Sequence, residues 1–221
     1  MSKKKEWISL FLGFIGALIG LYGVICFNQL ILMTLPLVLR MISMIVVYWL
    51  IVLIPIVLMR INKDTLEDYG FTKNSVGCQI LIGISIAVVI SLILTLVPHL
   101  LGLGEYFDTG RRYQYLWQFI YEFFYCIIAV GFSEELVFRG FIYERFKRLF
   151  GKDWIAVIGS SFLFGVFHIF SGNIGQMMLT GCLGAFFCFC KLKIKNCSLL
   201  SLIIAHGVYD ALITVWASIL L

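Results

Sequence analysis

The sequence predicts an all-α protein, a polytopic transmembrane helix bundle of about seven to eight spans. Of its 221 residues, 62% are hydrophobic and only 13% are charged, whereas a soluble domain has roughly 45–50% and about 25%. Apolar runs of about twenty residues recur, and each can cross a hydrocarbon core of roughly 30 Å. No alternation of the barrel kind is present, which favours helices. We expect one membrane domain over residues 1–221.

Seven segments are expected to span the membrane: 7–27, 39–59, 78–98, 116–139, 154–170, 174–190 and 198–220. The first is too long for the apolar region of a signal peptide and lacks a cleavage site of small residues, so we interpret it as an uncleaved helix. It carries Gly13, Gly16, Gly20 and Gly23. Glycines at this spacing permit close helix contact, and packing within the bundle is favoured over a dimer interface.

Three stretches outside these segments have their own sequence character. Residues 28–38 are also apolar and could extend the second span or form a separate half-helix around Pro36. The stretch 60–77 is the most polar of the chain and is expected at the surface. Residues 140–150 interleave aromatic with basic side chains at helical spacing, so we expect them to continue the fourth helix to the membrane interface.

The distribution of basic residues predicts the orientation. With a cytoplasmic N-terminus, only Arg111 and Arg112 lie in outer segments. Thirteen of the 17 basic residues then lie in inner segments: Lys3, Lys4, Lys5, Arg60, Lys63, Lys73, Arg145, Lys147, Arg148, Lys152, Lys191, Lys193 and Lys195. The positive-inside rule therefore predicts a cytoplasmic N-terminus and an outer C-terminus. Because these residues are scattered through short loops, they determine topology and do not indicate a nucleic-acid partner.

Ionisable residues recur inside the last four spans, where each is costly and indicates a functional site. They are Glu134, Glu135, Arg139, His168, His206 and Asp210. Glu134 lies sixteen residues before Phe150, and His168 sixteen after Lys152. At about 1.5 Å per residue, both lie roughly 24 Å along antiparallel neighbours. His206 lies eleven residues after Lys195, which predicts a position somewhat nearer the cytoplasm.

Helical spacing assigns faces to these residues. Glu135 and Arg139 are four residues apart, in the order that favours an ion pair. Glu134 points about 100° away and is left facing a cavity. The pair His206 and Asp210 shares the same spacing, as do Phe164 and His168, which predicts a phenyl ring beneath the imidazole. A partly desolvated cavity glutamate suits a general base.

Signatures of other protease classes are absent. The chain has no His-Glu-x-x-His zinc motif, and Ser133 lacks a Gly-x-Ser-x-Gly setting. Glu-Glu-x-x-x-Arg at 134–139, Phe-x-x-x-His at 164–168 and His-x-x-x-Asp at 206–210 resemble the three motifs of the CPBP family of intramembrane proteases. That family includes CAAX-processing endopeptidases and bacterial self-immunity (Abi) proteins. The resemblance covers about residues 115–215, and the spans within 7–98 carry no motif.

The resemblance implies a role for each residue. Glu134 would activate the attacking water, His168 would help to hold it, and His206 with residue 210 would stabilise the oxyanion. Glu135 and Arg139 would support the site. The family more often has Asn at position 210, and an ionised Asp cannot donate a hydrogen bond. Asp210 must therefore be protonated, orient His206 or help to bind a metal.

A metal is left open at this stage. Glu134, His168 and His206 are an acceptable zinc set with room for a water, which would make the protein a metalloprotease. A metal-free glutamate protease is the alternative. We favour it because an acid-rich site can activate water without zinc.

The resemblance implies an intramembrane endopeptidase of the cell membrane, whose site faces the cytoplasm. Its partners would be the lipid bilayer and a membrane-associated peptide or protein substrate. Bacterial peptide maturation or bacteriocin immunity is the implied role. A non-catalytic immunity or scaffold protein is the second hypothesis. A proton-coupled transporter is the third, and the lack of an internal repeat argues against it. The sequence leaves the oligomeric state open.

Overall fold

The structure is a computed structural model, and it describes residues 2–102, 110, 112–171 and 174–220. Every regular element in this part of the chain is helical, so the predicted fold class is confirmed. Seven helices among these residues are long and apolar enough to cross a membrane: Lys3–Thr34, Leu37–Ile61, Val76–Leu100, Leu116–Phe150, Asp153–Phe170, Ile174–Lys193 and Leu199–Leu220. They reproduce the seven predicted segments. Arg111, assigned to an outer loop, lies outside the described residues.

The prediction that residues 28–38 extend the second span holds only for Leu37 and Val38, and no half-helix forms around Pro36. Helix α1 spans Lys3–Leu30, so residues 28–30 extend the first span and not the second. One 3-10 turn follows at Leu32–Thr34, and α2 spans Leu37–Tyr48. Pro36 precedes the first turn of α2, where its fixed φ and missing N–H suit a helix start. Leu35 is extended, as expected before proline.

The glycine face of α1 packs inside the bundle. Helix α3 spans Leu50–Ile61 and lies along α1. A Cβ atom on Gly16 would overlap the side chain of Ile54, and one on Gly20 would overlap the backbone of Leu50. A Cβ atom on Gly13 would collide with the Phe141 ring of the fourth span. The predicted packing within the bundle is therefore confirmed for these three glycines.

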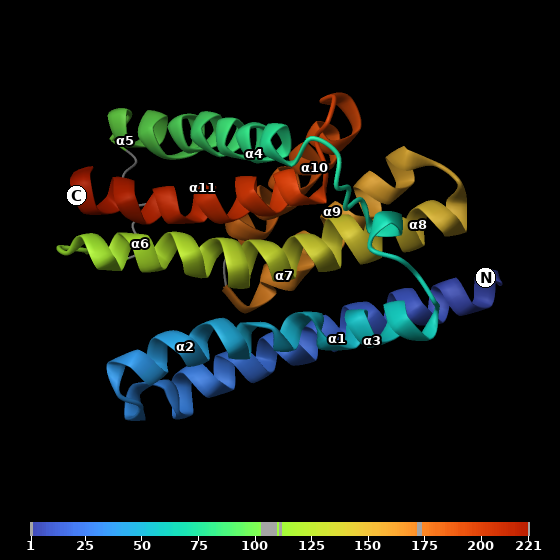
Figure 1. The fold of residues 1–221 in the computed structure, drawn as a ribbon, viewed down its shortest axis with the longest axis horizontal. Coiled ribbons are helices and arrows are strands. Elements are labelled where there is room, and N and C mark those ends of the chain that lie inside the picture. Colours follow the sequence, from blue (N-terminus) through green and yellow to red (C-terminus); the bar gives the residue numbers. More distant parts are fainter. Residues whose placement is uncertain (1, 103–109, 111, 172–173, 221) are drawn as a thin grey trace.

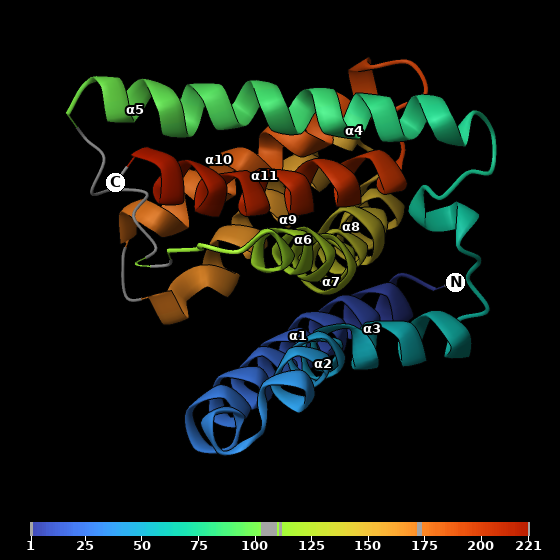
Figure 2. The ribbon, with the colours of Figure 1, turned by 60° about the vertical axis from the view of Figure 1, so that its left-hand side comes forward.

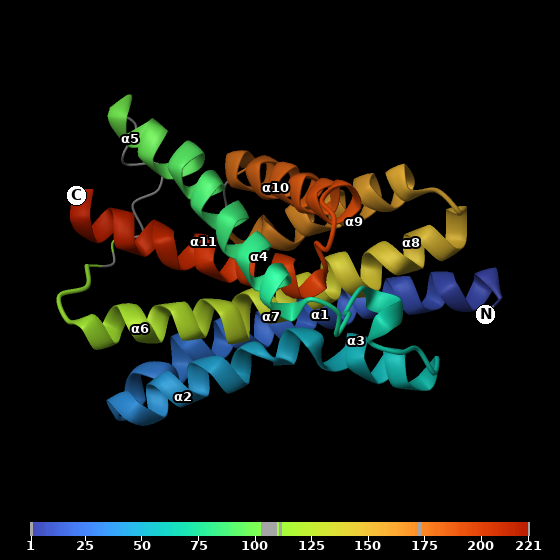
Figure 3. The same cartoon turned by 45° about the horizontal axis from the view of Figure 1, so that its top comes forward.

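The helices form layers around α11. Figures 1 and 2 show α11 (Leu199–Leu220) between α4 (Val76–Ser91) on one side and the long fourth span on the other. The α1–α3 pair covers the opposite side of that span. Helix α9 (Asp153–Phe167) packs against α10 (Ile174–Lys193), and α4 with its short extension α5 (Val97–Leu100) crosses over α11 (Figure 3).

The fourth span is one continuous helix with two π-helical segments. It consists of α6 (Leu116–Tyr125), the π segment Cys126–Gly131, α7 (Phe132–Glu135), the π segment Leu136–Ile142 and α8 (Tyr143–Phe150). The predicted continuation through residues 140–150 is thus confirmed. π-Helical turns are rare and occur frequently at functional sites. The pair of glutamates lies on the short α-helical piece between the two segments.

Helix α11 packs closely against the fourth span at two glycine residues. A Cβ atom on Gly131 would overlap the carbonyl oxygen of Ile203, and one on Gly207 would overlap the backbone of Ile127. Because glycine has no side chain, α11 lies against the first π segment at backbone distance. This contact places the residues just after Gly131 beside those around Gly207.

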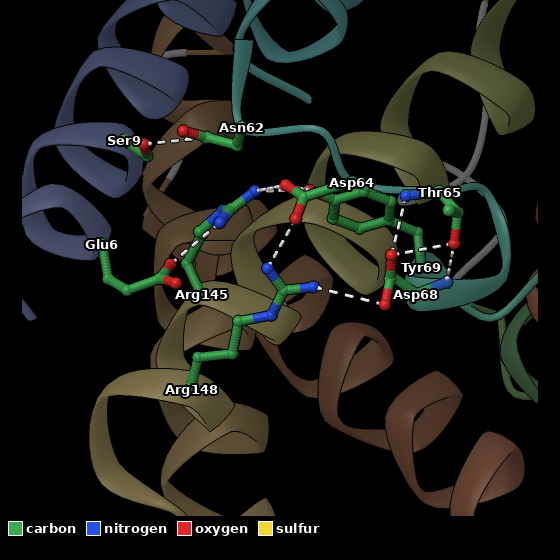
Figure 4. A network of polar contacts seen from close by, with 9 residues as sticks. All are labelled: Glu6, Ser9, Asn62, Asp64, Thr65, Asp68, Tyr69, Arg145 and Arg148. Atoms are coloured by element: carbon green, nitrogen blue, oxygen red, sulfur yellow. Dashed lines mark hydrogen bonds and ion pairs between the residues drawn. The ribbon is translucent and has the colours of Figure 1, made fainter. Parts of the chain in front are cut away.

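A polar network closes one end of the bundle (Figure 4). Arg145 is fully buried, and its guanidinium pairs with Glu6 at 2.9 Å and also with Asp64. Arg148 binds the second Asp64 oxygen at 2.6 Å, and the Tyr69 hydroxyl donates to Asp64. The polar loop after α3 therefore folds onto α8 and α1. The interpretation of Arg145 as only a topology determinant is wrong, because its charge is buried and paired.

This network predicts loss of stability in acid. Burial alone would raise the pKa of Asp64, but hydrogen bonds from Arg148, Tyr69 and Arg145 outweigh burial and lower it. The stabilisation is therefore present above the unfolded value near pH 4 and is lost as pH falls through the lower folded value. We expect Asp64→Asn to have a lower thermal midpoint than the parent at pH 7. The difference should shrink toward about pH 3, whereas exposed Glu67→Gln should match the parent throughout.

Candidate active site

The predicted site residues of three helices meet inside the bundle. Glu134 of α7 directs its Oε2 atom toward His168, with 3.9 Å to the ring Nε2, and toward His206 of α11, with 3.8 Å to Nε2. Asp210 lies one turn further along α11, and its Oδ2 is 3.4 Å from the same His206 nitrogen. The two carboxylates and the two imidazoles thus form one cluster, together with the Glu135–Arg139 pair described next.

The Glu135–Arg139 ion pair forms as the helical spacing predicts. Arg139 Nη1 lies 2.9 Å from Glu135 Oε1, and the two side chains are 1% and 0% exposed. The Arg139 guanidinium also lies over the ring of Phe164, 4.0 Å from its centroid, and 5.5 Å from that of Phe187. Such cation–π contacts are strongest when desolvated. Arg139 therefore anchors the fourth span to both α9 and α10.

Glu135 has a second partner that sequence reasoning missed. His206 Nδ1 lies 2.7 Å from Glu135 Oε1, and this nitrogen must carry the hydrogen because an ionised carboxylate only accepts. Glu135 therefore fixes the orientation of His206 and leaves its Nε2 atom to face Glu134 and Asp210. The interpretation of Glu135 as mainly the partner of Arg139 is incomplete.

The depth of His206 in a membrane stays a prediction, but its Nε2 atom lies only 3.8 Å from Glu134 Oε2. The start of α11 lies inside the bundle. Ser198 and Leu199 are buried, and the Leu199 N–H donates to the Gly70 carbonyl oxygen.

The backbone fixes the tautomer of His168. Its Nδ1 lies 2.9 Å from the carbonyl oxygen of Phe164. Because a carbonyl only accepts, Nδ1 carries the hydrogen, and Nε2 of the neutral ring is an acceptor that faces Glu134. The ring stands edge-on to the Phe164 phenyl group at 4.8 Å. The predicted phenyl wall at His168 is confirmed.

Tyr48 is a site residue that the sequence did not reveal. Its hydroxyl donates to Glu134 Oε1 at 2.5 Å from the end of α2. The only sequence signal was a phenol inside the apolar run 39–59, which is common in membrane helices. Tyr48 and Glu134 are 86 positions apart, and no periodicity connects them.

A cavity of about 240 Å³ opens on this cluster. Its lining comes from α1, α2, α7, the last residue of α9 and the 3-10 turn His168–Ser171 that follows: Leu21, Ile25, Tyr48, Glu134, Phe167, His168 and Phe170. Glu134 Oε2 is buried and has no hydrogen-bond partner within the described part of the chain. Distances of 3.8 and 3.9 Å to the two imidazoles are too long for direct hydrogen bonds but suit one bridging water.

Among the described residues, no group of three or more His, Cys, Asp and Glu side chains is arranged to hold a metal ion. This holds for Glu134, His168 and His206, the zinc set considered from the sequence. As the side chains lie, the donor set does not fit a zinc site, and no chemical step is assigned to a metal.

Comparison with known proteins gives one result. The family model described as type II CAAX prenyl endopeptidase Rce1-like matches residues 116–212. The matched region contains all six residues predicted for the site, and Tyr48 lies outside it. No curated protein and no solved structure matches the chain.

Proposed function

We propose, from the match of residues 116–212 to the Rce1-like model of type II CAAX prenyl endopeptidases, that this protein hydrolyses a peptide bond through a water activated by Glu134. The family supports an intramembrane endopeptidase. One observation carries the assignment to Glu134: its Oε2 atom is buried, lacks a hydrogen-bond partner among the described residues and lies within 3.9 Å of two imidazoles. A buried carboxylate oxygen without a partner costs free energy, so its presence in a fold indicates a function.

The attacking water would lie between Glu134 Oε2 and His168 Nε2. Both atoms accept hydrogen bonds, so they take the two hydrogens of the water and leave an oxygen lone pair directed at the substrate carbonyl. As the water oxygen bonds to the carbonyl carbon, its proton passes to Glu134. When the carbon–nitrogen bond breaks, Glu134 returns this proton to the leaving amine, as general acid–base catalysis requires.

His206 would stabilise the oxyanion that forms in this step. Its Nδ1 hydrogen is committed to Glu135, so a donor for the oxyanion requires a second hydrogen on Nε2. Asp210 and Glu135 both lie beside the ring and would balance the positive charge of an imidazolium. A preorganised donor of this kind commonly contributes about a hundredfold to a thousandfold in kcat.

Asp210→Asn is expected to keep activity within about tenfold of the parent. The amide oxygen of Asn can still accept from His206 Nε2, while its N–H₂ group supplies a donor that ionised Asp lacks. A loss of about a hundredfold, typical when an orienting carboxylate is removed, would instead assign the negative charge of Asp210 to orientation of His206.

Peptidase activity is expected to persist in a strong chelator such as 1,10-phenanthroline and to be unaffected by added zinc. The physical reason is that Glu134 and His168 can polarise the water without a Lewis acid. The Asp210→Asn variant is assayed in parallel. If a metal were held too tightly in the parent for the chelator to remove it, loss of the Asp210 carboxylate would weaken its binding and make the variant sensitive to the chelator. Activity that disappears with chelator and returns with zinc would mean that Glu134, His168 and His206 rearrange around a metal.

We propose a short or membrane-associated peptide as the substrate, with bacterial peptide maturation or bacteriocin self-immunity as the role. Two experiments test this. A fluorogenic peptide ending in a farnesylated cysteine and three further residues, beside its unmodified copy, tests prenyl dependence. Mass spectrometry of the membrane peptidome with the parent and with Glu134→Gln identifies natural products. Identical peptidomes, with neither probe cleaved, would favour the non-catalytic immunity protein.

A further inference from the structure

We propose that Tyr48 is a positioning residue, which binds Glu134 Oε1 and so reserves Oε2 for the water. The inference rests on the proposed role of Glu134. It also assigns part of the site to α2, outside the matched region 116–212.

The contact itself is strong. The Tyr48 hydroxyl lies 2.5 Å from Glu134 Oε1, within the range of charge-assisted O–H···O⁻ bonds. An ionised carboxylate only accepts, so Tyr48 is the donor. Both groups line the same cavity. The bond therefore holds one carboxylate oxygen at the cavity wall and directs the other toward His168 and His206.

The surrounding packing fixes the phenol in place. Helix α2 ends at Tyr48 and α3 begins at Leu50. At the junction, Trp49 Nε1 donates to the Ile128 carbonyl oxygen at 3.0 Å. Ile128 belongs to the first π segment of the fourth span. The Tyr48 ring also stands edge-on to Tyr125 at 6.0 Å.

This arrangement joins two local irregularities. The junction between α2 and α3 lies directly against the π segment that precedes Glu134. The Trp49 side chain connects the two through its hydrogen bond to the Ile128 carbonyl oxygen. A merely space-filling aromatic residue at position 48 would need the ring and not the hydroxyl. The hydroxyl instead makes the one hydrogen bond recorded for the Glu134 carboxylate, among the residues that the structure describes.

Removing the hydroxyl has two consequences for Glu134. Its carboxylate can rotate, so that the water loses its fixed position, and displacement by about 1 Å can cost roughly a hundredfold in rate. The ionised carboxylate also loses a donor that favours the charged form. Glu134 in a Tyr48→Phe protein should therefore take up a proton at higher pH.

A carbodiimide experiment tests this without a substrate. Carbodiimides modify protonated carboxyl groups, so labelling of Glu134 by dicyclohexylcarbodiimide between about pH 5 and about pH 9, followed by peptide mass spectrometry, reports its protonation. For Tyr48→Phe we expect the midpoint at higher pH than in the parent, because the hydrogen bond that favours the ionised carboxylate is lost. The control is Tyr121→Phe, which loses a 2.9 Å hydrogen bond from α6 to the Met41 carbonyl of α2. It should match the parent.

A second variant keeps the ring and the hydroxyl in case Tyr48→Phe does not fold. Difluorotyrosine at position 48 has a more acidic hydroxyl and donates more strongly, so the Glu134 labelling midpoint should move to lower pH. Opposite shifts for the two variants support the inference. Identical midpoints in parent, Tyr48→Phe and difluorotyrosine proteins would overturn it.

Kinetics with the farnesylated peptide separate this inference from the proposed function. Tyr48→Phe should lower kcat by about tenfold to a hundredfold, with KM nearly unchanged and the acid limb of the rate profile at higher pH. If Glu134→Gln remains active, the proposed function fails while the labelling result still decides the role of Tyr48. If Glu134→Gln is inactive but Tyr48→Phe equals the parent in both assays, only the Tyr48 inference fails.

Discussion

Glu134→Gln is expected to lose peptidase activity by about a hundredfold to ten-thousandfold, the contribution of a well-placed general base. The amide has nearly the same shape as the carboxylate and can still accept from Tyr48 at Oε1, so the fold should be retained. It cannot take a proton from the water. Turnover of the farnesylated probe, at equal amounts of folded protein in detergent, is the measurement. Glu134→Ala should be equally inactive.

The matched control for this variant is Glu122→Gln. Glu122 is also buried and lies on the same span. It accepts from Tyr113 at 2.8 Å and from Thr214 at 3.2 Å, away from the two histidines. The control should therefore keep its activity even if its thermal midpoint falls. Full turnover by Glu134→Gln would remove Glu134 from water activation.

Arg139→Ala is expected to destabilise the protein by about 3–5 kcal/mol, the cost of leaving a buried charge without its partner. Glu135 would keep only His206 as a partner, and the guanidinium that lies over Phe164 would leave an unfilled space. The thermal midpoint in detergent should fall further than in Glu134→Ala.

Lys147→Ala provides the comparison for Arg139. Lys147 pairs with Asp153 at 3.0 Å, but its side chain is 45% exposed, and such surface pairs contribute roughly 0–1 kcal/mol. This variant should unfold near the temperature of the parent. An Arg139→Ala protein that is as stable as Lys147→Ala yet inactive would mean that Arg139 acts in the chemistry and not in support.

The sequence by itself determined the class of fold and the membrane spans. Hydropathy and the length of an apolar run are local properties of the sequence. In a bilayer, an apolar run of about twenty residues forms a helix, because its backbone groups must be hydrogen-bonded within the segment. Pairs four residues apart were equally accessible, because one turn of helix fixes which side chains meet. Glu135 with Arg139 and Phe164 with His168 therefore followed from spacing alone. The cytoplasmic position of the N-terminus stays a prediction.

Only the tertiary structure decided which partner each motif residue contacts on another helix. Glu135 reaches His206 on another helix, and Tyr48 reaches Glu134 across 86 positions. Arg145 pairs with Glu6 of α1 and with Asp64 of the loop after α3. None of these contacts has a sequence period, because each depends on where one helix crosses another. Backbone contacts at Gly20, Gly131 and Gly207, together with the two π-helical segments, set those crossings, and packing between helices thereby directs each polar side chain to its partner.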